Sequence, residues 1–277
     1  MTDVDVVVAG GGSDGAVEAG ALAVLRTQLN FVRIGGASAG AINALAEAAG
    51  IESAPDLWRK FLTRGDLEDW HYPSPLRPLG VLGRGRGMMA GKRIRAALAE
   101  SFGRLRMGDL KKPCRIVVGN LAIREIEVID SDNAEHKDIL VVDAACCSSA
   151  VPFVIDAQQL RPTQRTLYTD GGTGANVPAG MFDDVPGRPT LILRFANSKV
   201  PKPVITLEDF AAAIFDIRQD AANRAMPSTK SAIYFVELPA SDDSLDFSLT
   251  MPEVDRRIRQ GRNAASAWVQ HNIRGGK

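Results

Sequence analysis

The chain has 277 residues, and its 33 Lys and Arg side chains balance 33 Asp and Glu, so the formal net charge is zero. This balance argues against a generic nucleic-acid binder. With 45% apolar and 24% charged residues, the composition is that of an ordinary globular protein and excludes a disordered, collagenous or coiled-coil chain. The three cysteines, two of them adjacent, do not form a disulfide framework, so a reducing compartment is the default.

Short apolar runs alternate with segments of helical periodicity from the start of the chain. Strands are predicted over Val4–Ala9, Phe31–Ile34, Arg115–Asn120, Ile126–Asp130, Thr166–Thr169, Leu191–Phe195 and Ile233–Leu238. Helices are predicted directly after Gly15 and over Ile42–Ala49, Lys92–Phe102, Leu207–Ala225 and Pro252–Asn272. The alternation predicts an α/β sheet with helices on both faces. The composition does not change along the chain, so we expect one domain over residues 1–277.

One segment interrupts this alternation. Residues His71–Gly91 contain three prolines and five glycines, which predicts a loop. No stretch of the chain has 18 uninterrupted apolar residues, so no transmembrane helix is expected. Four acidic residues precede the first basic one, Arg26, which is the reverse of a signal peptide. We therefore expect a cytoplasmic protein whose contact with membranes is peripheral.

The first motif is Gly10-Gly11-Gly12-Ser13-Asp14-Gly15, which satisfies G-x-G-x-x-G between a strand and a helix. A dinucleotide site also needs an acidic residue about 20 positions further on, and residues 28–32 contain none. Consecutive glycines at a helix N-terminus expose backbone N–H groups that bind an anion or a developing oxyanion. The loop alone leaves open a dinucleotide site, an oxyanion or phosphate cradle, and a plain tight turn.

The second motif is Gly36-Ala37-Ser38-Ala39-Gly40, a G-x-S-x-G between a strand and a helix. This pattern is typical of a nucleophile elbow, because the two glycines remove side chains that would clash in the strained turn. A small-residue turn with an incidental serine is the alternative. The motif follows the first glycine loop by 26 residues, and acyl transfer needs both parts, which favours a nucleophile.

A serine nucleophile needs a base. His71 and His136 lie in segments that are typical of the surface, whereas the chain order Ser38, Asp170, His271 matches the α/β-hydrolases and keeps a triad open. The third motif is Asp170-Gly171-Gly172, directly after a predicted strand. By itself this sequence is often only a turn.

The three motifs in this order, with Asn176 and Pro178 downstream, closely resemble the patatin-like phospholipases. The resemblance covers about residues 4–200. Two further segments support it: Gly87–Gly91, and the small-residue stretch Ala144–Pro152, which resembles a helix of that family. It implies a three-layer α/β/α sandwich with a mostly parallel central sheet.

The resemblance also implies the residues of the site and the activity. Ser38 is implied as the nucleophile and Asp170 as its partner in a Ser-Asp dyad without histidine. The backbone of Gly10, Gly11 and Gly12 is implied as the oxyanion hole, with Gly15, Gly36, Gly40, Gly171 and Gly172 as supporting glycines. The expected reaction is hydrolysis of fatty-acyl esters of phospholipids, lysophospholipids or acylglycerols through an acyl-serine intermediate. It needs no metal and no cofactor, and the sequence has no H-E-x-x-H, C-x-x-C or EF-hand pattern.

One residue departs from the family pattern. Asp14 stands where that family usually carries Arg or Lys, so a catalytically weakened lipid-binding or regulatory module on the same fold stays open. Asp14 is alternatively suited to cap the helix that follows. A dinucleotide-binding oxidoreductase is the third hypothesis, and it rests on the first glycine loop alone.

The charges are unevenly distributed. Residues Arg84–Arg115 carry a net charge of +8. The loop next to the basic side chains is apolar at Leu76, Leu79, Val81, Leu82, Met88 and Met89. Together they predict a surface, from about Leu76 to Arg115, that contacts an anionic membrane. A solvated helix face beside a mobile loop is the alternative.

Overall fold

The computed structural model describes residues 1–51, 53–73, 76–82, 87–196, 213–214, 217–218, 221–222, 227–230, 232–241 and 245–274. Within these residues, seven strands form one sheet. They are β1 (Thr2–Val8), β2 (Leu29–Ala37), β3 (Cys114–Asn120), β4 (Glu125–Asp130), β5 (Tyr168–Asp170), β6 (Thr190–Phe195) and β7 (Ile233–Leu238). The order is β4-β3-β2-β1-β6-β7, with β5 also paired to β3. β4 and β5 run antiparallel to β3 and the other pairs are parallel, which confirms a mostly parallel sheet.

Helices follow most of the strands. The α-helices are α1 (Gly15–Leu25), α2 (Ala39–Ala49), α3 (Ala54–Leu62), α4 (Lys92–Phe102), α5 (Val141–Ser148), α6 (Gly172–Ala175) and α8 (Met251–Val269). Short 3₁₀ turns are η1 (Gly12–Asp14), η2 (Arg77–Val81), η3 (Met107–Asp109) and η4 (Ala179–Phe182), and a π turn, η5 (Gln270–Arg274), follows α8.

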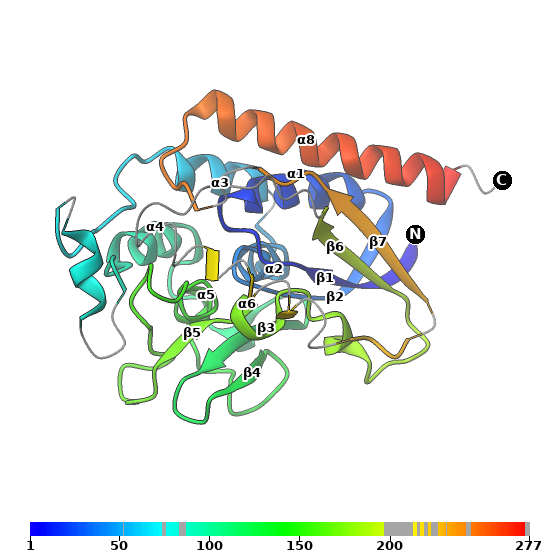
Figure 1. Ribbon diagram of the computed structural model, residues 1–277. Coiled ribbons are helices and arrows are strands. Elements are labelled where there is room, and N and C mark those ends of the chain that lie inside the picture. The colour runs from blue at the N-terminus through cyan, green and yellow to red at the C-terminus, as the bar shows by residue number, and fades with distance from the viewer. Residues whose placement is uncertain are drawn as a thin grey trace.

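Alternate residues of β1 face two different layers of the core. Val6 and Val8 belong to a large cluster with side chains of α1, α2, α4, α5 and α8. Val7 belongs to a second cluster that includes Ala175 of α6 and Phe182 of η4. Because side chains alternate along a strand, both faces of the sheet are covered. Figure 1 shows these layers, with α8 running along α1 at the top. The predicted α/β/α arrangement is confirmed.

The end of β2 and the end of β5 meet on one edge of β3. β4 pairs with β3 from Arg115 to Asn120, so β2 and β5 share the other edge. β2 pairs with this edge as far as Ala37 opposite Val117, and β5 continues it with Asp170 opposite Val118. The residue after Ala37 and the last residue of β5 are therefore brought together by the sheet itself.

The predicted strands are all present, with ends that differ by a few residues. The sequence analysis missed α3, although it has Pro55 in its first turn and buries one face. The family-like helix over Ala144–Pro152 is misplaced: α5 begins at Val141 and ends at Ser148, before the proline. The predicted helix Leu207–Ala225 lies for the most part outside the described residues.

The segment between Trp70 and Gly91 is less open than a Pro/Gly-rich loop suggests. Trp70 bridges to Met89, which also bridges to Ile155, and η2 lies within the segment. Met88 and Met89 are buried. The prediction that these two methionines belong to an exposed surface is therefore wrong. In the part of the chain that the structure describes, no helix has the length and apolar character needed to span a bilayer.

Candidate active site

Ser38 lies on a sharp turn between β2 and α2. Its φ of 53° and ψ of −124° are strained for a residue with a side chain. A Cβ added to Gly36 or Gly40 would collide with backbone oxygens at the end of β1, so these glycines let the turn pack directly against that strand. This is the local geometry that the G-x-S-x-G pattern predicts.

The Ser38 hydroxyl donates a hydrogen bond to Asp170. The Oγ–Oδ2 distance is 2.7 Å, and the backbone N–H of Gly172 donates to the other oxygen, Oδ1, at 2.6 Å. Asp170 is fully buried and Ser38 is 4% exposed. Burial raises the pKa of Asp170 to about 7, and the hydrogen bonds from Ser38 and Gly172 oppose this rise. A carboxyl group with this pKa is suited to accept a proton at neutral pH.

Ser148, at the end of α5, supports both sides of this pair. The backbone N–H of Ser38 donates to Ser148 Oγ at 3.0 Å, and that hydroxyl donates to the carbonyl oxygen of Val117 at 2.7 Å. The N–H of Gly171 donates to the carbonyl oxygen of Ser148 at 3.2 Å. Ser148 was not predicted as a site residue, and its only signal in the sequence is a hydroxyl within a run of small residues.

The glycine loop lies against the serine turn. A Cβ added to Gly10 would collide with Asn176 Oδ1 and lie 3.1 Å from Ser38 Cβ. The N–H of Gly10 donates to the carbonyl oxygen of Asn176 at 3.1 Å, so it is occupied. Among the described residues, the backbone hydrogen bonds outside the helices and strands include none donated by the N–H groups of Gly11 and Gly12. These two groups therefore remain as the candidate oxyanion donors.

Asp14 is buried and stands at the N-cap position of α1, as the sequence suggests, but its side chain makes no capping hydrogen bond. Its Oδ1 lies 3.0 Å from Nη1 of Arg257, and its Oδ2 accepts the backbone N–H of Ser241 at 2.8 Å. Burial raises the pKa of Asp14, while these two partners oppose the rise. A cation is thus present beside this loop, supplied by α8 rather than by the loop itself.

The three histidines lie in different places. His71 Nε2 is 2.9 Å from an oxygen of Asp156, and its side chain is 18% exposed, so His71 is half-buried. His136 is half-buried. His271 is exposed in η5, directly after α8. The hydroxyl of Ser38 is bonded to Asp170, so the contacts give no support to a triad with His271.

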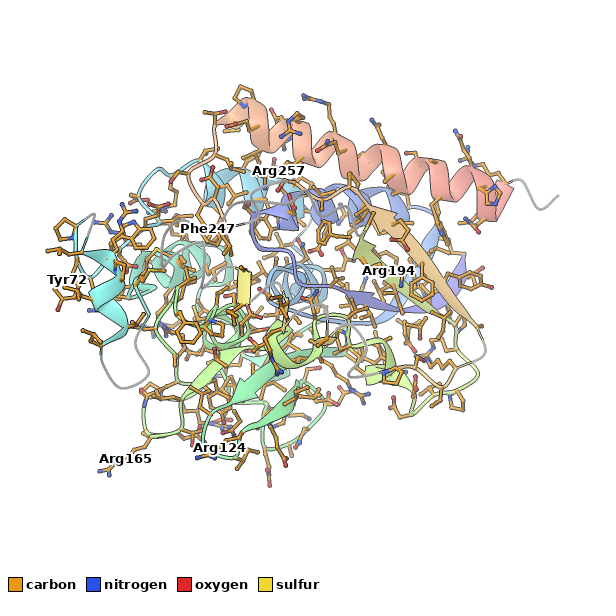
Figure 2. The ribbon with its side chains drawn as sticks, viewed as in Figure 1. Tyr72, Arg124, Arg165, Arg194, Phe247 and Arg257 are labelled. Carbon is orange, nitrogen blue, oxygen red and sulfur yellow. The ribbon has the colours of Figure 1, made fainter. Side chains whose placement is uncertain are left out.

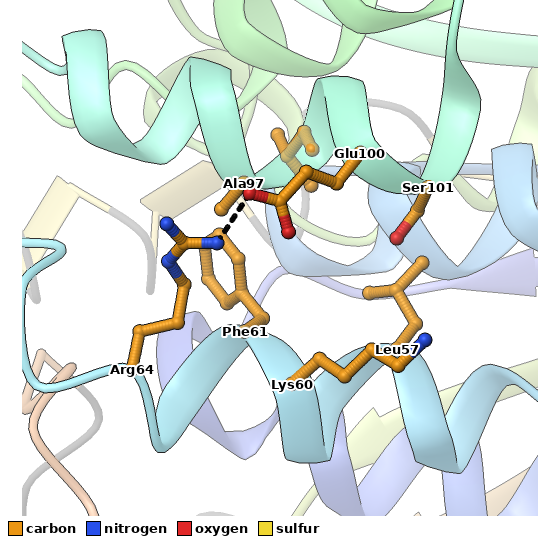
Figure 3. Close-up of a pocket in the computed structure, with 8 residues that line it drawn as sticks. Leu57, Lys60, Phe61, Arg64, Ala97, Glu100 and Ser101 are labelled. Carbon is orange, nitrogen blue, oxygen red and sulfur yellow. Dashed lines mark hydrogen bonds and ion pairs between the residues drawn. The ribbon is translucent and has the colours of Figure 1, made fainter.

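Two hollows lie away from Ser38. The first, between α3 and α4, has a volume of about 10 Å³ and is crossed by the Arg64–Glu100 ion pair (Figure 3). It has room for about one water molecule. The second measures about 350 Å³ and is lined by residues 68–73 with Arg77 and Arg93. Among the described residues, no cluster of three or more His, Cys, Asp or Glu side chains is placed to hold a metal ion.

The fold and the serine turn place the protein in the α/β class of three-layer proteins with a strand–elbow–helix site. The family model for patatin-like phospholipases matches residues 6–183, and the chain belongs to this family. The matched residues include the glycine loop, Ser38 and Asp170, whereas α8 and Arg257 lie beyond them.

The chain also resembles solved structures. One is VipD from Legionella pneumophila, with a TM-score of 0.56 and 14% identity over 97% of this chain and 67% of VipD. Another is the type III effector protein ExoU, with a TM-score of 0.45 and 15% identity over 98% of this chain and 53% of ExoU. At this identity, the likeness to VipD shows the fold alone. No curated protein matches the chain.

Proposed function

We propose that this protein is a lipid acyl hydrolase that cleaves fatty-acyl esters through an acyl-serine intermediate. The observation that carries the proposal is the 2.7 Å hydrogen bond from Ser38 Oγ to the buried carboxylate of Asp170. Membership of the patatin-like phospholipases supports lipid esters as substrates, with phospholipids, lysophospholipids and acylglycerols as the candidate classes.

In the proposed acylation step, Ser38 Oγ attacks the ester carbonyl carbon and its proton passes to Asp170 Oδ2. The N–H groups of Gly11 and Gly12 stabilise the negative charge on the carbonyl oxygen. The carbon–oxygen bond to the leaving alcohol then breaks, and Asp170 returns the proton to that alcohol. In deacylation, Asp170 takes a proton from water, which attacks the acyl-serine carbonyl carbon. The bond from that carbon to Ser38 Oγ then breaks, the fatty acid is released, and Asp170 returns the proton to Ser38 Oγ.

The surroundings of Asp170 suit it to this role. Burial raises the pKa of Asp170 to about 7, so the carboxylate is a much stronger base than an exposed aspartate. The Gly172 N–H holds Oδ1 at 2.6 Å and leaves Oδ2 directed at the serine. The carboxylate therefore does not need an intervening histidine to receive the proton.

The hypothesis of a catalytically weakened module depended on a missing cation at the glycine loop. Arg257 Nη1 lies 3.0 Å from Asp14, so a cation from α8 balances this carboxylate and the loop carries no uncompensated negative charge from Asp14, which favours an active enzyme. The oxyanion role of the loop is also favoured over dinucleotide binding, because the N–H of Gly10 is bonded to Asn176 and the loop abuts Ser38.

The proposal is tested with a fluorophosphonate probe and a short-chain p-nitrophenyl ester. The probe is expected to label Ser38. Ser38→Ala and Asp170→Asn are each expected to lower turnover by at least about 1000-fold. Ser149→Ala is the matched control. Ser149 follows Ser148 at the end of α5, and its hydroxyl donates to the carbonyl oxygen of Ala145 rather than to the Ser38–Asp170 pair. Labelling at another residue, or turnover by folded Asp170→Asn, would contradict the dyad.

A membrane-contacting surface is proposed around η2. Large apolar side chains are exposed there: Tyr72, Leu76, Leu79, Leu82 and Phe153. Several basic residues of Arg84–Arg115, the segment with a net charge of +8, are instead neutralised. Arg95, Lys112 and Arg115 pair with carboxylates elsewhere in the fold. The apolar side chains, more than the charge, thus support peripheral contact with a lipid surface.

Vesicle binding tests this surface. A Leu79→Asp/Leu82→Asp variant is expected to lose roughly tenfold in binding to anionic vesicles, with hydrolysis of a soluble ester unchanged. Ile123→Asp is the control, because Ile123 is 59% exposed on the β3–β4 hairpin. Equal vesicle binding by the double variant and the wild type would refute the surface.

A further inference from the structure

Helix α8 packs closely along α1. A Cβ added to Gly20 of α1 would collide with the carbonyl oxygen of Ile258, and one added to Gly261 of α8 would collide with that of Val17. The two helices therefore approach backbone to backbone, and the contact does not tolerate larger residues. This packing sets the position of α8 relative to the glycine loop, which immediately precedes α1.

From this helix, Arg257 reaches the loop. Figure 2 shows Arg257 where α8 passes over the start of α1. Its Nη1 donates to Ser13 Oγ at 2.7 Å and lies 3.0 Å from Asp14 Oδ1. Arg257 is 4% exposed and Asp14 is 2% exposed. The backbone of Ser241 holds the second oxygen of Asp14, so two contacts from the C-terminal part of the chain converge on this one carboxylate.

The contacts bracket the candidate oxyanion donors. On one side, the N–H of Gly10 is held by the carbonyl oxygen of Asn176. On the other side, Ser13 and Asp14 are held by Arg257. Between them lie Gly11 and Gly12, and Gly12 has a positive φ of 55°. Glycines lose more conformational freedom on folding than any other residue, so this pair depends on its neighbours to keep its N–H groups aligned.

A buried ion pair is not, in general, a strong source of stability. Taking both charges out of water offsets most of their attraction, and well-packed apolar residues often replace such a pair without loss. The pair does, however, fix the relative positions of the groups that carry it. Its place, directly after the two donor glycines, is where positional accuracy matters for an oxyanion hole.

We infer that Arg257 is a positioning residue for the proposed reaction: through Ser13 and Asp14 it holds the Gly11–Gly12 backbone in the alignment that stabilises the oxyanion. The inference rests on the proposed function. It makes α8, which lies beyond the family match, a working part of the site. Arg257 acts through the loop and need not touch the substrate.

The test compares Arg257→Gln, Arg257→Lys and Asp14→Asn with Arg259→Ala, an exposed arginine of the same helix. The kcat and KM for a p-nitrophenyl ester and the rate of fluorophosphonate labelling are measured well below the Tm of each variant. Arg257→Gln and Asp14→Asn are expected to lower kcat and labelling roughly 10- to 100-fold with KM changed less than about threefold. Arg257→Lys retains a charge and is expected to recover part of the loss, and Arg259→Ala is expected to match the wild type.

The outcomes separate this inference from the proposed function. If wild-type protein neither turns over ester nor reacts at Ser38, the proposed function fails and the inference fails with it. If the wild type is active and folded Arg257→Gln keeps wild-type kcat, only the inference is overturned. If Arg257→Gln does not fold, the kcat of Asp14→Asn tests the inference instead, because this change preserves the side-chain volume. A wild-type kcat in Asp14→Asn also overturns the inference.

Discussion

The two glycine-rich turns of the site, Gly10–Gly15 and Gly36–Gly40, are held in different ways. Both connect a parallel strand to a helix. The serine turn is held mainly by backbone packing, because Gly36 and Gly40 abut the carbonyl oxygens at the end of β1. One side chain adds to this, since Ser148 Oγ on α5 accepts the N–H of Ser38. Its conformation is determined by the sheet on which it sits.

The glycine loop is instead held by contacts from distant parts of the chain. Asn176 lies more than 160 residues from Gly10, and Arg257 lies 243 residues from Asp14. Ser38 is thus positioned mainly by close backbone packing against the sheet, whereas the residues on either side of the candidate oxyanion donors are held by contacts with residues more than 160 positions away. Substitutions in the serine turn are therefore expected to affect stability most, and substitutions at the distant contacts are expected to affect activity with less effect on the fold.

The largest effect is expected from breaking the serine turn. Gly40→Ala places a Cβ against the backbone of β1 and is expected to lower the free energy of unfolding by about 3 kcal/mol or more. Gly187→Ala is the control, since a Cβ there meets nothing within 4 Å. Urea denaturation checks both variants, and equal midpoints for the two would show that the turn is not held by this close approach.

The next effect concerns Asp170, the proposed base beside the serine turn. Because the pKa of Asp170 is raised to about 7, kcat/KM for a soluble ester is expected to rise with pH and to be about 100-fold lower at pH 5 than at its plateau. An aspartate with an ordinary pKa of 3.8 would give a nearly flat profile over the same range. The pH profile of kcat/KM, corrected for spontaneous hydrolysis, distinguishes the two.

A smaller loss of activity is expected from Ser148→Ala. The change removes the acceptor of the Ser38 N–H and loosens the turn without altering the dyad. We expect kcat to fall about tenfold, as for a modest displacement of a reacting group, while Ser149→Ala keeps wild-type kcat. Should Ser148→Ala retain full kcat, the strained backbone of the serine turn would be held by the sheet alone.

The smallest effect concerns Glu18, one turn along α1 from the glycine loop. Glu18 is fully buried and accepts a hydrogen bond from Asn43 at 2.9 Å, and burial raises the pKa of its carboxyl well above 4.5. The folded state therefore keeps a proton that the unfolded state releases, so stability falls as pH rises above the ordinary carboxyl pKa. Each unit of such a shift corresponds to about 1.4 kcal/mol.

Glu18→Gln is expected to remove this pH dependence. The variant should be more stable than the wild type at pH 8 and equal to it near pH 4, where Glu18 is protonated in both states. Urea denaturation at the two pH values checks this. If the free energies of unfolding of Glu18→Gln and the wild type differ by the same amount at both pH values, Glu18 contributes through packing rather than through its charge.

The sheet and the serine turn were accessible from the sequence for physical reasons. Runs of β-branched residues predict the buried strands. The glycines around Ser38 indicate a turn that is too tight for side chains. Asp170 was accessible only through the family resemblance, since an Asp-Gly-Gly sequence by itself is also a turn signal. The contact between the two arises from the pairing of β2 and β5 with β3, which no local pattern encodes.

The remaining features depend on tertiary contacts. Nothing in the periodicity of α8 distinguishes Arg257 from its exposed neighbour Arg259, because the difference is the loop that packs against it. The burial of Met88 and Met89 depends on their pairing with Trp70 and the backbone after Val151. Prolines and glycines in that segment predict irregular backbone, which is correct, but they carry no information on exposure.

The shared edge of β3 has a mechanical consequence. Ala37 and Asp170 lie opposite Val117 and Val118, which are consecutive residues of one strand. Consecutive Cα atoms are about 3.8 Å apart across a trans peptide, a spacing set by covalent bonds. Slow bending or twisting of the sheet therefore moves the Ser38 hydroxyl and the Asp170 carboxylate together and changes the distance between them little. Transfer of this serine–aspartate pair to another scaffold therefore requires one strand long enough to pair, along the same edge, with both the strand before the serine and the strand that ends in the aspartate.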